Sequence, residues 1–227
     1  TIDGSWNGSE VNRGKFLGMV EGGTTYSGVT TGIDHLVEMG VTHVQILPFY
    51  DFATPHYNWG YDPNNYNIPE EQYSATPTDY VNRIKEVMTM VNEFHKRGIR
   101  VIMDVVYNHT YGDEMFENIT TKYFTGTNDS GTGNGINTGI PMVSRMIRDS
   151  LEYWIDVYNI DGYRFDLIGI FHYDEVRKWG EHINSVFAGE NILMYGEPWN
   201  GYWADPNEGQ KVRLGTTRFM ASGHVGV

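Results

Sequence analysis

The 227-residue sequence contains no cysteine. This absence excludes disulfide bonds, zinc sites built from thiolates and cysteine nucleophiles. It does not fix a compartment, because cytosolic proteins and many secreted bacterial enzymes share it, so cytoplasmic and extracellular locations both stay open. The sequence also lacks an initiating methionine and any N-terminal apolar segment that resembles a signal peptide. We therefore expect it to be a piece of a longer chain.

Positive charge is scarce, with 16 Lys and Arg against 29 Asp and Glu and a formal net charge of −13. Nucleic acids and anionic membranes are bound by basic surfaces, so neither is expected as a partner. No stretch approaches the roughly 18 apolar residues that span a bilayer, so membrane insertion is not expected. The 16 Tyr, 6 Trp and 27 Gly suit a neutral, hydroxyl-rich partner such as a sugar, although an acidic protein with an aromatic core has the same composition. Nothing in the composition indicates an oligomeric state.

Four stretches repeat one order: a helical pattern, a glycine or turn, and an apolar β-rich run. In one of them Thr76 is a predicted N-cap, Pro77 occupies the first helical position and Gly98 closes the helix. The four predicted strands lie in "VTHVQILP", "IRVIMDVVY", "YRFDLIGI" and "NILMYGEPW". Strands that are apolar on both faces and alternate with helices indicate a parallel sheet, either doubly wound or closed into a (β/α)8 barrel. No Gly-x-Gly-x-x-Gly follows a strand, which disfavours a dinucleotide-binding sheet.

Polar residues at the ends of three predicted strands favour the barrel. Such barrels carry their active sites at the C-terminal ends of their strands. The residues concerned are Asp104, Asn108 and His109, then Arg164 and Asp166, and finally Glu197. A barrel needs eight strands and only four are counted. Residues 1–227 are thus expected to form one partial catalytic TIM-barrel domain of a larger chain.

Two acids stand one strand–helix–strand unit apart. Asp166 and Glu197 are 31 positions apart, so their side chains are expected to project from adjacent strands. A single acid there often only caps the next helix, but two facing carboxylates are what glycoside hydrolysis requires. Arg164 shares a strand face with Asp166 and favours its ionised form, as an ordinary buried ion pair also would. Pro198 and Trp199 follow Glu197, and an apolar setting there would keep a carboxylic acid protonated near neutrality.

Two other polar segments have weaker signals of their own. A lone histidine such as His109 is more often structural, and no second histidine lies at ligand spacing, so a transition-metal site is not expected. Hydrogen bonding to sugar hydroxyls is the preferred interpretation of "DVVYNHT" at 104–110. The run "YNWGYDP" at 57–63 mixes large rings with turn-forming residues, which predicts an aromatic loop rather than a strand or helix.

These segments carry a resemblance to a known family. "DVVYNHT", "GYRFDLIGI" and "GEPW" resemble, in order and spacing, the first three signature regions of the α-amylase family of glycoside hydrolases. "YNWGYDP" resembles the signature of type I pullulanases, which debranch α-1,6-linked glucans. "VTHVQILPFYDF" and "RGIRVIMDVVYNHT" are also similar to that family, so the resemblance covers essentially the whole chain.

The resemblance implies roles for the acids and their neighbours. Asp166 matches the nucleophile and Glu197 the general acid/base. Arg164 and His109 match residues around the sugar at the cleavage point. Trp199 would line the leaving-group side.

It also implies roles for the loop and for the strand before it. Tyr61 matches the aromatic residue on which that sugar stacks, and Trp59 of the same loop is expected at the substrate. Asp104 and Asn108 match positions that mostly hold loops together at the substrate site. In related amylases the asparagine often ligates calcium, but nothing else in the sequence supports a calcium site, so no metal or cofactor is expected.

The activity implied is that of a retaining hydrolase cleaving α-1,6 branch linkages in pullulan, starch or glycogen-type α-glucans. The alternatives are an α-1,4-acting amylase or glucanotransferase of the same family, or a non-catalytic amylase-like protein. The last is disfavoured because Asp166, Glu197 and Arg164 are all present. The family's fourth region, with its third essential carboxylate, has no counterpart here, and the family's first strand precedes Thr1. About strands two to five are therefore expected, and the 227-residue piece alone is expected to be inactive.

Overall fold

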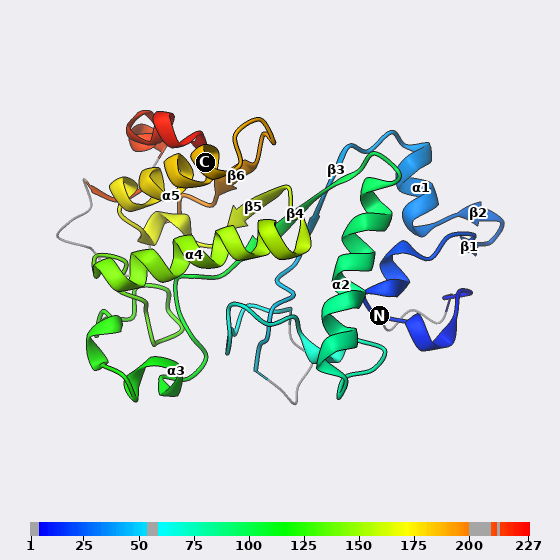
Figure 1. Cartoon of the computed structure of the whole chain (residues 1–227), viewed down its shortest axis with the longest axis horizontal. Coiled ribbons are helices and arrows are strands. Elements are labelled where there is room, and N and C mark those ends of the chain that lie inside the picture. Colours follow the sequence, from blue (N-terminus) through cyan, green and yellow to red (C-terminus); the bar gives the residue numbers. More distant parts are fainter. Residues whose placement is uncertain (1–4, 54–58, 200–209, 213) are drawn as a thin grey trace.

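The computed structural model describes residues 5–53, 59–199, 210–212 and 214–227 (Figure 1). Its centre is a parallel sheet in which each strand pairs with its neighbours in the sequence, in the order β3-β4-β5-β6-β7. The strands are β3 (His43–Ile46), β4 (Arg100–Val105), β5 (Gly162–Phe165), β6 (Leu193–Gly196) and β7 (Val225–Gly226). The sequence predicts the first four. The fifth, β7, is only two residues long, too short to produce an apolar run.

Helices precede the strands of this sheet in the chain, as the alternating pattern predicts. They are α1 (Gly32–Glu38), α2 (Tyr80–His95), α4 (Pro141–Tyr158), α5 (Tyr173–Val186) and the 3₁₀ helix η7 (Leu214–Gly223). The antiparallel pair β1 (Thr25–Tyr26) and β2 (Val29–Thr30) lies before α1, and α3 (Glu114–Glu117) lies between β4 and α4. Short 3₁₀ turns complete the described chain: η1 (Glu10–Asn12), η2 (Leu17–Val20), η3 (Glu71–Tyr73), η4 (Thr121–Tyr123) and η5 (Ile168–Ile170).

The start of α2 differs from the prediction. The helix begins at Tyr80, and its N-cap is Asp79, whose carboxylate accepts a hydrogen bond of 2.9 Å from the backbone N–H of Asn82. The predicted cap, Thr76, lies in the turn before it and accepts a side-chain hydrogen bond of 2.6 Å from Asn82. Aspartate is as good a cap as threonine, and both lie close to the first helical turn, so capping rules alone do not choose between them. The predicted stop at Gly98 is confirmed by its φ of +73° just after the helix.

One face of the sheet is covered by helices, and Figure 1 shows α4 and α5 running side by side along it. Tyr163 donates a hydrogen bond of 2.6 Å to the carbonyl of Leu151 in α4. Phe165 stacks at 6.3 Å between ring centroids on Trp179 of α5. Both side chains are fully buried. Since side chains alternate along a strand, Arg164 between them must point to the opposite face.

That opposite face is curved. Tyr195 in β6 donates a hydrogen bond of 2.5 Å to the side-chain oxygen of Gln45 in β3. Strands in a sheet are about 4.8 Å apart, so a flat sheet would hold β3 and β6 about 14 Å apart with their side chains parallel. The two side chains meet only because the sheet bends toward this face. A curved parallel sheet with helices on its outer side is a segment of a barrel. Among the described residues, no helix is both long and apolar enough to cross a membrane.

Candidate active site

The sheet register brings the two acids side by side. Phe165 and Gly196 are the last paired residues of β5 and β6. Asp166 and Glu197 follow them directly, and the ladder continues through both: the N–H of Asp166 donates to Val105 at 2.9 Å, and that of Glu197 to Phe165 at 3.1 Å. The two acids therefore occupy neighbouring positions at the C-terminal edge of the sheet.

Arg164 connects three carboxylates at this edge. Its Nη1 donates to the two oxygens of Asp104 at 2.7 and 2.9 Å and to Oδ1 of Asp166 at 3.4 Å. Its Nη2 forms an ion pair with Oε1 of Glu197. Asp104 is fully buried, Arg164 is 9% exposed, and the two acids at the strand ends are more open. One guanidinium thus draws together residues from β4, β5 and the end of β6.

Burial dominates the protonation of this cluster. It raises the pKa of Asp104 to about 6, although Arg164 and Tyr61 lower that pKa by hydrogen bonding. Burial also raises the pKa of Asp166, against the opposing effects of Asn108 and Arg164. The pKa of Arg164 is raised because its hydrogen bonds to Asp104 outweigh the effect of burial. With one cation among three acids, the site retains protons to higher pH than isolated aspartates do.

Asn108 and His109 follow β4 and hold the backbone around Asp166. The amide nitrogen of Asn108 donates to the backbone carbonyl of Asp166 at 3.1 Å and to its Oδ2 at 2.9 Å. Its amide oxygen lies 2.5 Å from Nδ1 of His109. Because that oxygen can only accept, Nδ1 carries the proton and Nε2 is the acceptor. Nε2 is buried and has no hydrogen-bond partner among the described residues, and burial lowers the pKa of the ring.

The described part of the aromatic loop reaches the same cluster. Tyr57 and Asn58 lie outside the described residues. Tyr61 donates its hydroxyl to Oδ2 of Asp104 at 2.8 Å, and burial raises the pKa of that hydroxyl. Trp59 is 61% exposed, and no hydrogen bond among the described residues joins its side chain to the cluster. The prediction is confirmed for the described part of the loop, since Trp59 and Tyr61 lie in neither helix nor strand.

The surroundings of Glu197 differ from the apolar setting considered above. Its side chain is 34% exposed and contacts the guanidinium of Arg164. Trp199 is 62% exposed and has no hydrogen bond to the cluster among the described residues. Side chains alternate along each strand, so Arg164 and Glu197 point to the same face of the sheet and meet there. Because the contact joins two strands, the residues next to Glu197 in the sequence do not predict it.

The segments that carry the two acids touch through their backbones. The N–H of Gly169, in η5, donates to the carbonyl of Glu197 at 3.2 Å. A Cβ at position 169 would lie 2.0 Å from the carbonyl oxygen of Trp199, so only glycine allows this approach. Gly169 was not singled out from the sequence, because the contact joins residues almost thirty positions apart.

Tyr195 is a second residue that the sequence reasoning missed. It stands two positions before Glu197, as Arg164 stands two before Asp166, and its Cα is paired with that of Arg164. The same i, i+2 rule would have placed it on the inner face.

No group of three or more His, Asp or Glu side chains in the described ranges is arranged to hold a metal ion.

Comparison with known proteins gives consistent likenesses. The family model of the alpha amylase catalytic domain matches residues 7–128. A pullulanase of Bacillus subtilis (strain 168) is 38% identical over 225 residues, covering 92% of this chain and 31% of that relative. The solved pullulanase from Bacillus acidopullulyticus superposes with a TM-score of 0.91 at 36% identity, over 100% of this chain and 29% of that one.

The crystal structure of pullulanase type I from Bacillus subtilis str. 168 complexed with maltose gives a TM-score of 0.90 at 34% identity, over 100% of this chain and 33% of that chain. The chain thus spans about a third or less of the length of these relatives. The (β/α)8 fold expected from the sequence is confirmed, with part of the barrel present as the curved sheet β3–β7. The family model covers more than half of the sequence, and the chain belongs to the alpha-amylase family.

Proposed function

We propose that residues 1–227 are part of the catalytic barrel domain of a retaining glycoside hydrolase that cleaves α-1,6 branch linkages in α-glucans. The observation that carries the proposal is the pairing of Asp166 and Glu197 at the ends of adjacent strands, both in contact with Arg164. Retaining enzymes need carboxyl groups about 5–5.5 Å apart, whereas inverting enzymes need about 6.5–9.5 Å to admit a water. Acids on adjacent strands that share one guanidinium fit the shorter spacing.

In this mechanism Asp166 attacks the anomeric carbon while Glu197 protonates the glycosidic oxygen, so that the carbon–oxygen bond breaks and a covalent glycosyl-enzyme forms. Glu197 then takes a proton from water, which attacks the same carbon and releases Asp166. The pair with Arg164 implies that the guanidinium must release Glu197 when the leaving group arrives. The reaction proposed here uses these carboxylates and no cofactor.

Other side chains of the cluster are proposed to bind the sugar at the cleavage point. The buried Nε2 of His109, which no described residue hydrogen-bonds, is suited to accept a hydrogen bond from a sugar hydroxyl. Tyr61 offers a partly buried ring whose orientation is held by Asp104. The exposed rings of Trp59 and Trp199 provide apolar surface at the rim for further sugar units. Asp104 and Asn108 contribute by holding Arg164, Tyr61 and Asp166 in place.

The preference for α-1,6 linkages rests on two observations: the "YNWGYDP" segment and the relatives named pullulanase. The test is digestion of pullulan by the full-length protein that carries this chain, with products separated by chromatography. Maltotriose is the expected main product, because α-1,6 bonds in pullulan separate units of three glucoses. Rapid cleavage of linear amylose without action on pullulan would contradict the linkage and favour an α-1,4-acting amylase or glucanotransferase. An inactive protein that still binds glucan would favour the non-catalytic alternative.

A further inference from the structure

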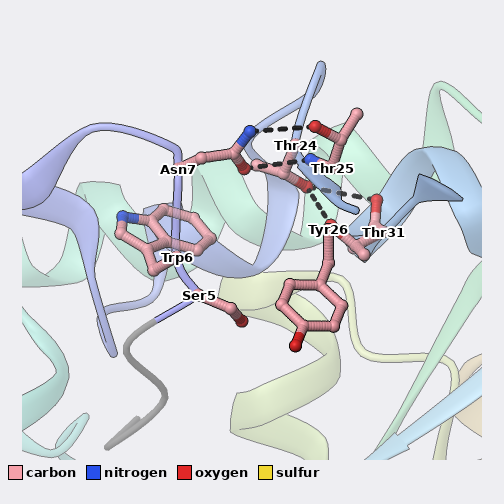
Figure 2. Close-up of a pocket in the computed structure, with 8 residues that line it drawn as sticks. Ser5, Trp6, Asn7, Thr24, Thr25, Tyr26 and Thr31 are labelled. Atoms are coloured by element: carbon pink, nitrogen blue, oxygen red, sulfur yellow. Dashed lines mark hydrogen bonds between the residues drawn. The ribbon is translucent and has the colours of Figure 1, made fainter. Parts of the chain in front are cut away.

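A hollow of about 460 Å³ lies in the N-terminal part of the chain (Figure 2). Figure 1 shows β1 and β2, which border it, away from β5 and β6. It is formed between the segment before η1 and the β1–β2 hairpin. Its principal lining residues are Trp6, Asn7, Thr24, Thr25, Tyr26 and Thr31. None of them belongs to the catalytic cluster. The volume falls within the range of about 300–1,000 Å³ that is typical of small-molecule sites.

The chemistry of the lining is that of a neutral, hydroxylated ligand. None of the lining residues that the structure describes is charged, although the protein carries a net charge of −13. An ionic ligand would find no countercharge on these side chains. A sugar ring offers C–H faces to Trp6 and Tyr26 and hydroxyls to Asn7 and the threonines. Figure 2 shows the two rings on opposite sides of the hollow, with Asn7 and Thr24 along another edge.

The polar edge of the hollow is held in one geometry. Asn7 and Thr25 exchange two hydrogen bonds: the amide nitrogen of Asn7 donates to the threonine hydroxyl at 3.0 Å, and the N–H of Thr25 donates to the asparagine oxygen at 2.9 Å. The hydroxyl of Thr31 donates to that of Thr24 at 3.0 Å, and Thr24 donates to the carbonyl of Thr31 at 3.1 Å. The first pair joins the N-terminal segment to the hairpin, and the second closes the base of the hairpin, so both fix the positions of the groups that would meet a ligand.

The Trp6 ring is also fixed, whereas Tyr26 is open. The indole N–H of Trp6 donates to the carbonyl of Ser9 at 3.1 Å. A Cβ on Gly8 would lie 2.4 Å from Cζ2 of the ring, so the backbone at Gly8 packs directly against it. Tyr26 is 60% exposed, and its hydroxyl makes no hydrogen bond within the described part of the chain. The fixed position of the Trp6 ring reduces the side-chain entropy lost when a ligand binds.

We propose that this hollow is a non-catalytic carbohydrate site, in which Trp6 and Tyr26 contact a short segment of neutral α-glucan. That the sugar is an α-glucan rests on the proposed function, whereas its neutrality and hydroxylated character rest on the lining alone. A second site on the same protein would keep a polymeric substrate attached while the strand-end site cuts it.

The test uses the full-length protein with Asp166→Asn, so that bound glucan is not cut, and with 5-fluorotryptophan in place of tryptophan. The ¹⁹F signal of Trp6 is identified by its loss in a Trp6→Phe variant. Titration with maltoheptaose is expected to shift this signal, and Tyr26→Ala is expected to weaken the binding it reports by about tenfold. Gly8→Ala, which displaces the ring without removing it, is expected to weaken binding as well. Tyr80→Ala is the matched control, since Tyr80 is also exposed, at 68%, and lies outside the hollow.

Three outcomes overturn the proposal. One is a Trp6 signal that does not move at maltoheptaose concentrations saturating the strand-end site. Another is the same apparent affinity at Trp6 in Tyr26→Ala and in Tyr80→Ala. The third is an equal shift with β-linked cellohexaose, which would remove the α-glucan assignment. Hydrolysis of pullulan by the protein with Asp166 intact is measured separately, so failure of this site and failure of the proposed activity are distinguishable.

Discussion

Tyr163 and Phe165 face the helices, and Arg164 between them faces the other way, so one short strand contributes to two unlike surfaces. On the helix side, Tyr163, Phe165 and the facing Trp179 are buried and closely packed. On the inner side, the carboxylates of Asp104 and Glu197 share the guanidinium of Arg164. Leu47, just after β3, and Leu193, at the start of β6, are 48% and 42% exposed. The helix side is closely packed, whereas the inner side keeps charged and apolar side chains partly exposed.

The helix side of the sheet contributes mainly to stability, and the inner side contributes mainly to chemistry. Apolar side chains on the helix side are removed from water and stabilise the fold at about 25 cal/mol for each Å² buried. The inner side holds carboxyl groups with raised pKa values and a histidine nitrogen that has no hydrogen-bond partner among the described residues. Both features are unfavourable for stability and useful for catalysis. Alternation by one residue is enough to assign a position to one role or the other. The inactivity expected of the 227-residue polypeptide alone stays a prediction.

The largest expected effect is on the inner side. Asp166→Asn in the full-length protein should reduce pullulan hydrolysis by about 10⁴-fold or more, because the amide cannot form the glycosyl-enzyme. Its unfolding temperature should not fall, since the change removes a carboxylate whose burial disfavours its charge and raises its pKa. The measurements are reducing-sugar release and calorimetry. If the variant unfolds at a clearly lower temperature, the inner side also stabilises the fold, and the two sides do not differ in the way described.

The second effect is on the helix side. Trp179→Ala should lower the free energy of unfolding by about 3–5 kcal/mol, because the ring is 1% exposed, stacks on Phe165 and donates a hydrogen bond to Ser144. The matched control is Trp199→Ala, whose 62% exposed ring should change stability by less than about 0.5 kcal/mol. Denaturant titration of both variants tests the pair. Equal losses would show that burial does not distinguish the two surfaces.

A third effect concerns pH. Asp104 has a pKa of about 6 in the folded protein against 3.8 when exposed, so its stabilising contribution is present below about pH 4 and is lost as the pH rises through 6. The unmodified protein should therefore lose stability relative to Asp104→Asn between pH 4 and 6. In Asp104→Asn, Arg164 interacts with two carboxylates instead of three, so the pKa of Asp166 should fall. The acid limb of the pH profile of kcat/KM should therefore move to lower pH.

Asp51→Asn is the control for this pH effect. Burial raises the pKa of Asp51 to about 6 as well, but no hydrogen bond within the described residues joins its side chain to the cluster. It should reproduce the change in stability and leave the acid limb in place. An acid limb that moves equally in both variants would contradict the role given to Arg164.

The smallest effect tests the curvature. Tyr195→Phe removes the hydrogen bond to Gln45 across the inner side and should cost about 0.5–1 kcal/mol of stability. The matched variant is Gln45→Leu, and the double variant should cost no more than the larger single one if the two groups act as a pair. Additive losses in this double-mutant cycle would show that the bond does not form in solution.

Periodicity and strand-end chemistry predicted four strands, their parallel arrangement and the position of the acids. They failed for an element that is too short to show a pattern, for a choice between two caps, and for contacts between residues far apart in the sequence. β7 is two residues long, and the start of α2 depends on a choice between Thr76 and Asp79. The pair between Arg164 and Glu197 forms between strands, and no local pattern records it.

The backbone contact between Gly169 and Glu197 has a consequence for how this region tolerates changes of length. Asp166 and Glu197 are 31 positions apart in the sequence, but the hydrogen bond between Gly169 and Glu197 closes that interval at the sheet edge. Residues added or removed between α5 and β6 would lengthen or shorten an outer connection while the ends that carry the acids stay joined. We therefore expect insertions there to be tolerated, whereas a single methyl group at position 169 would push the two acid-bearing segments apart.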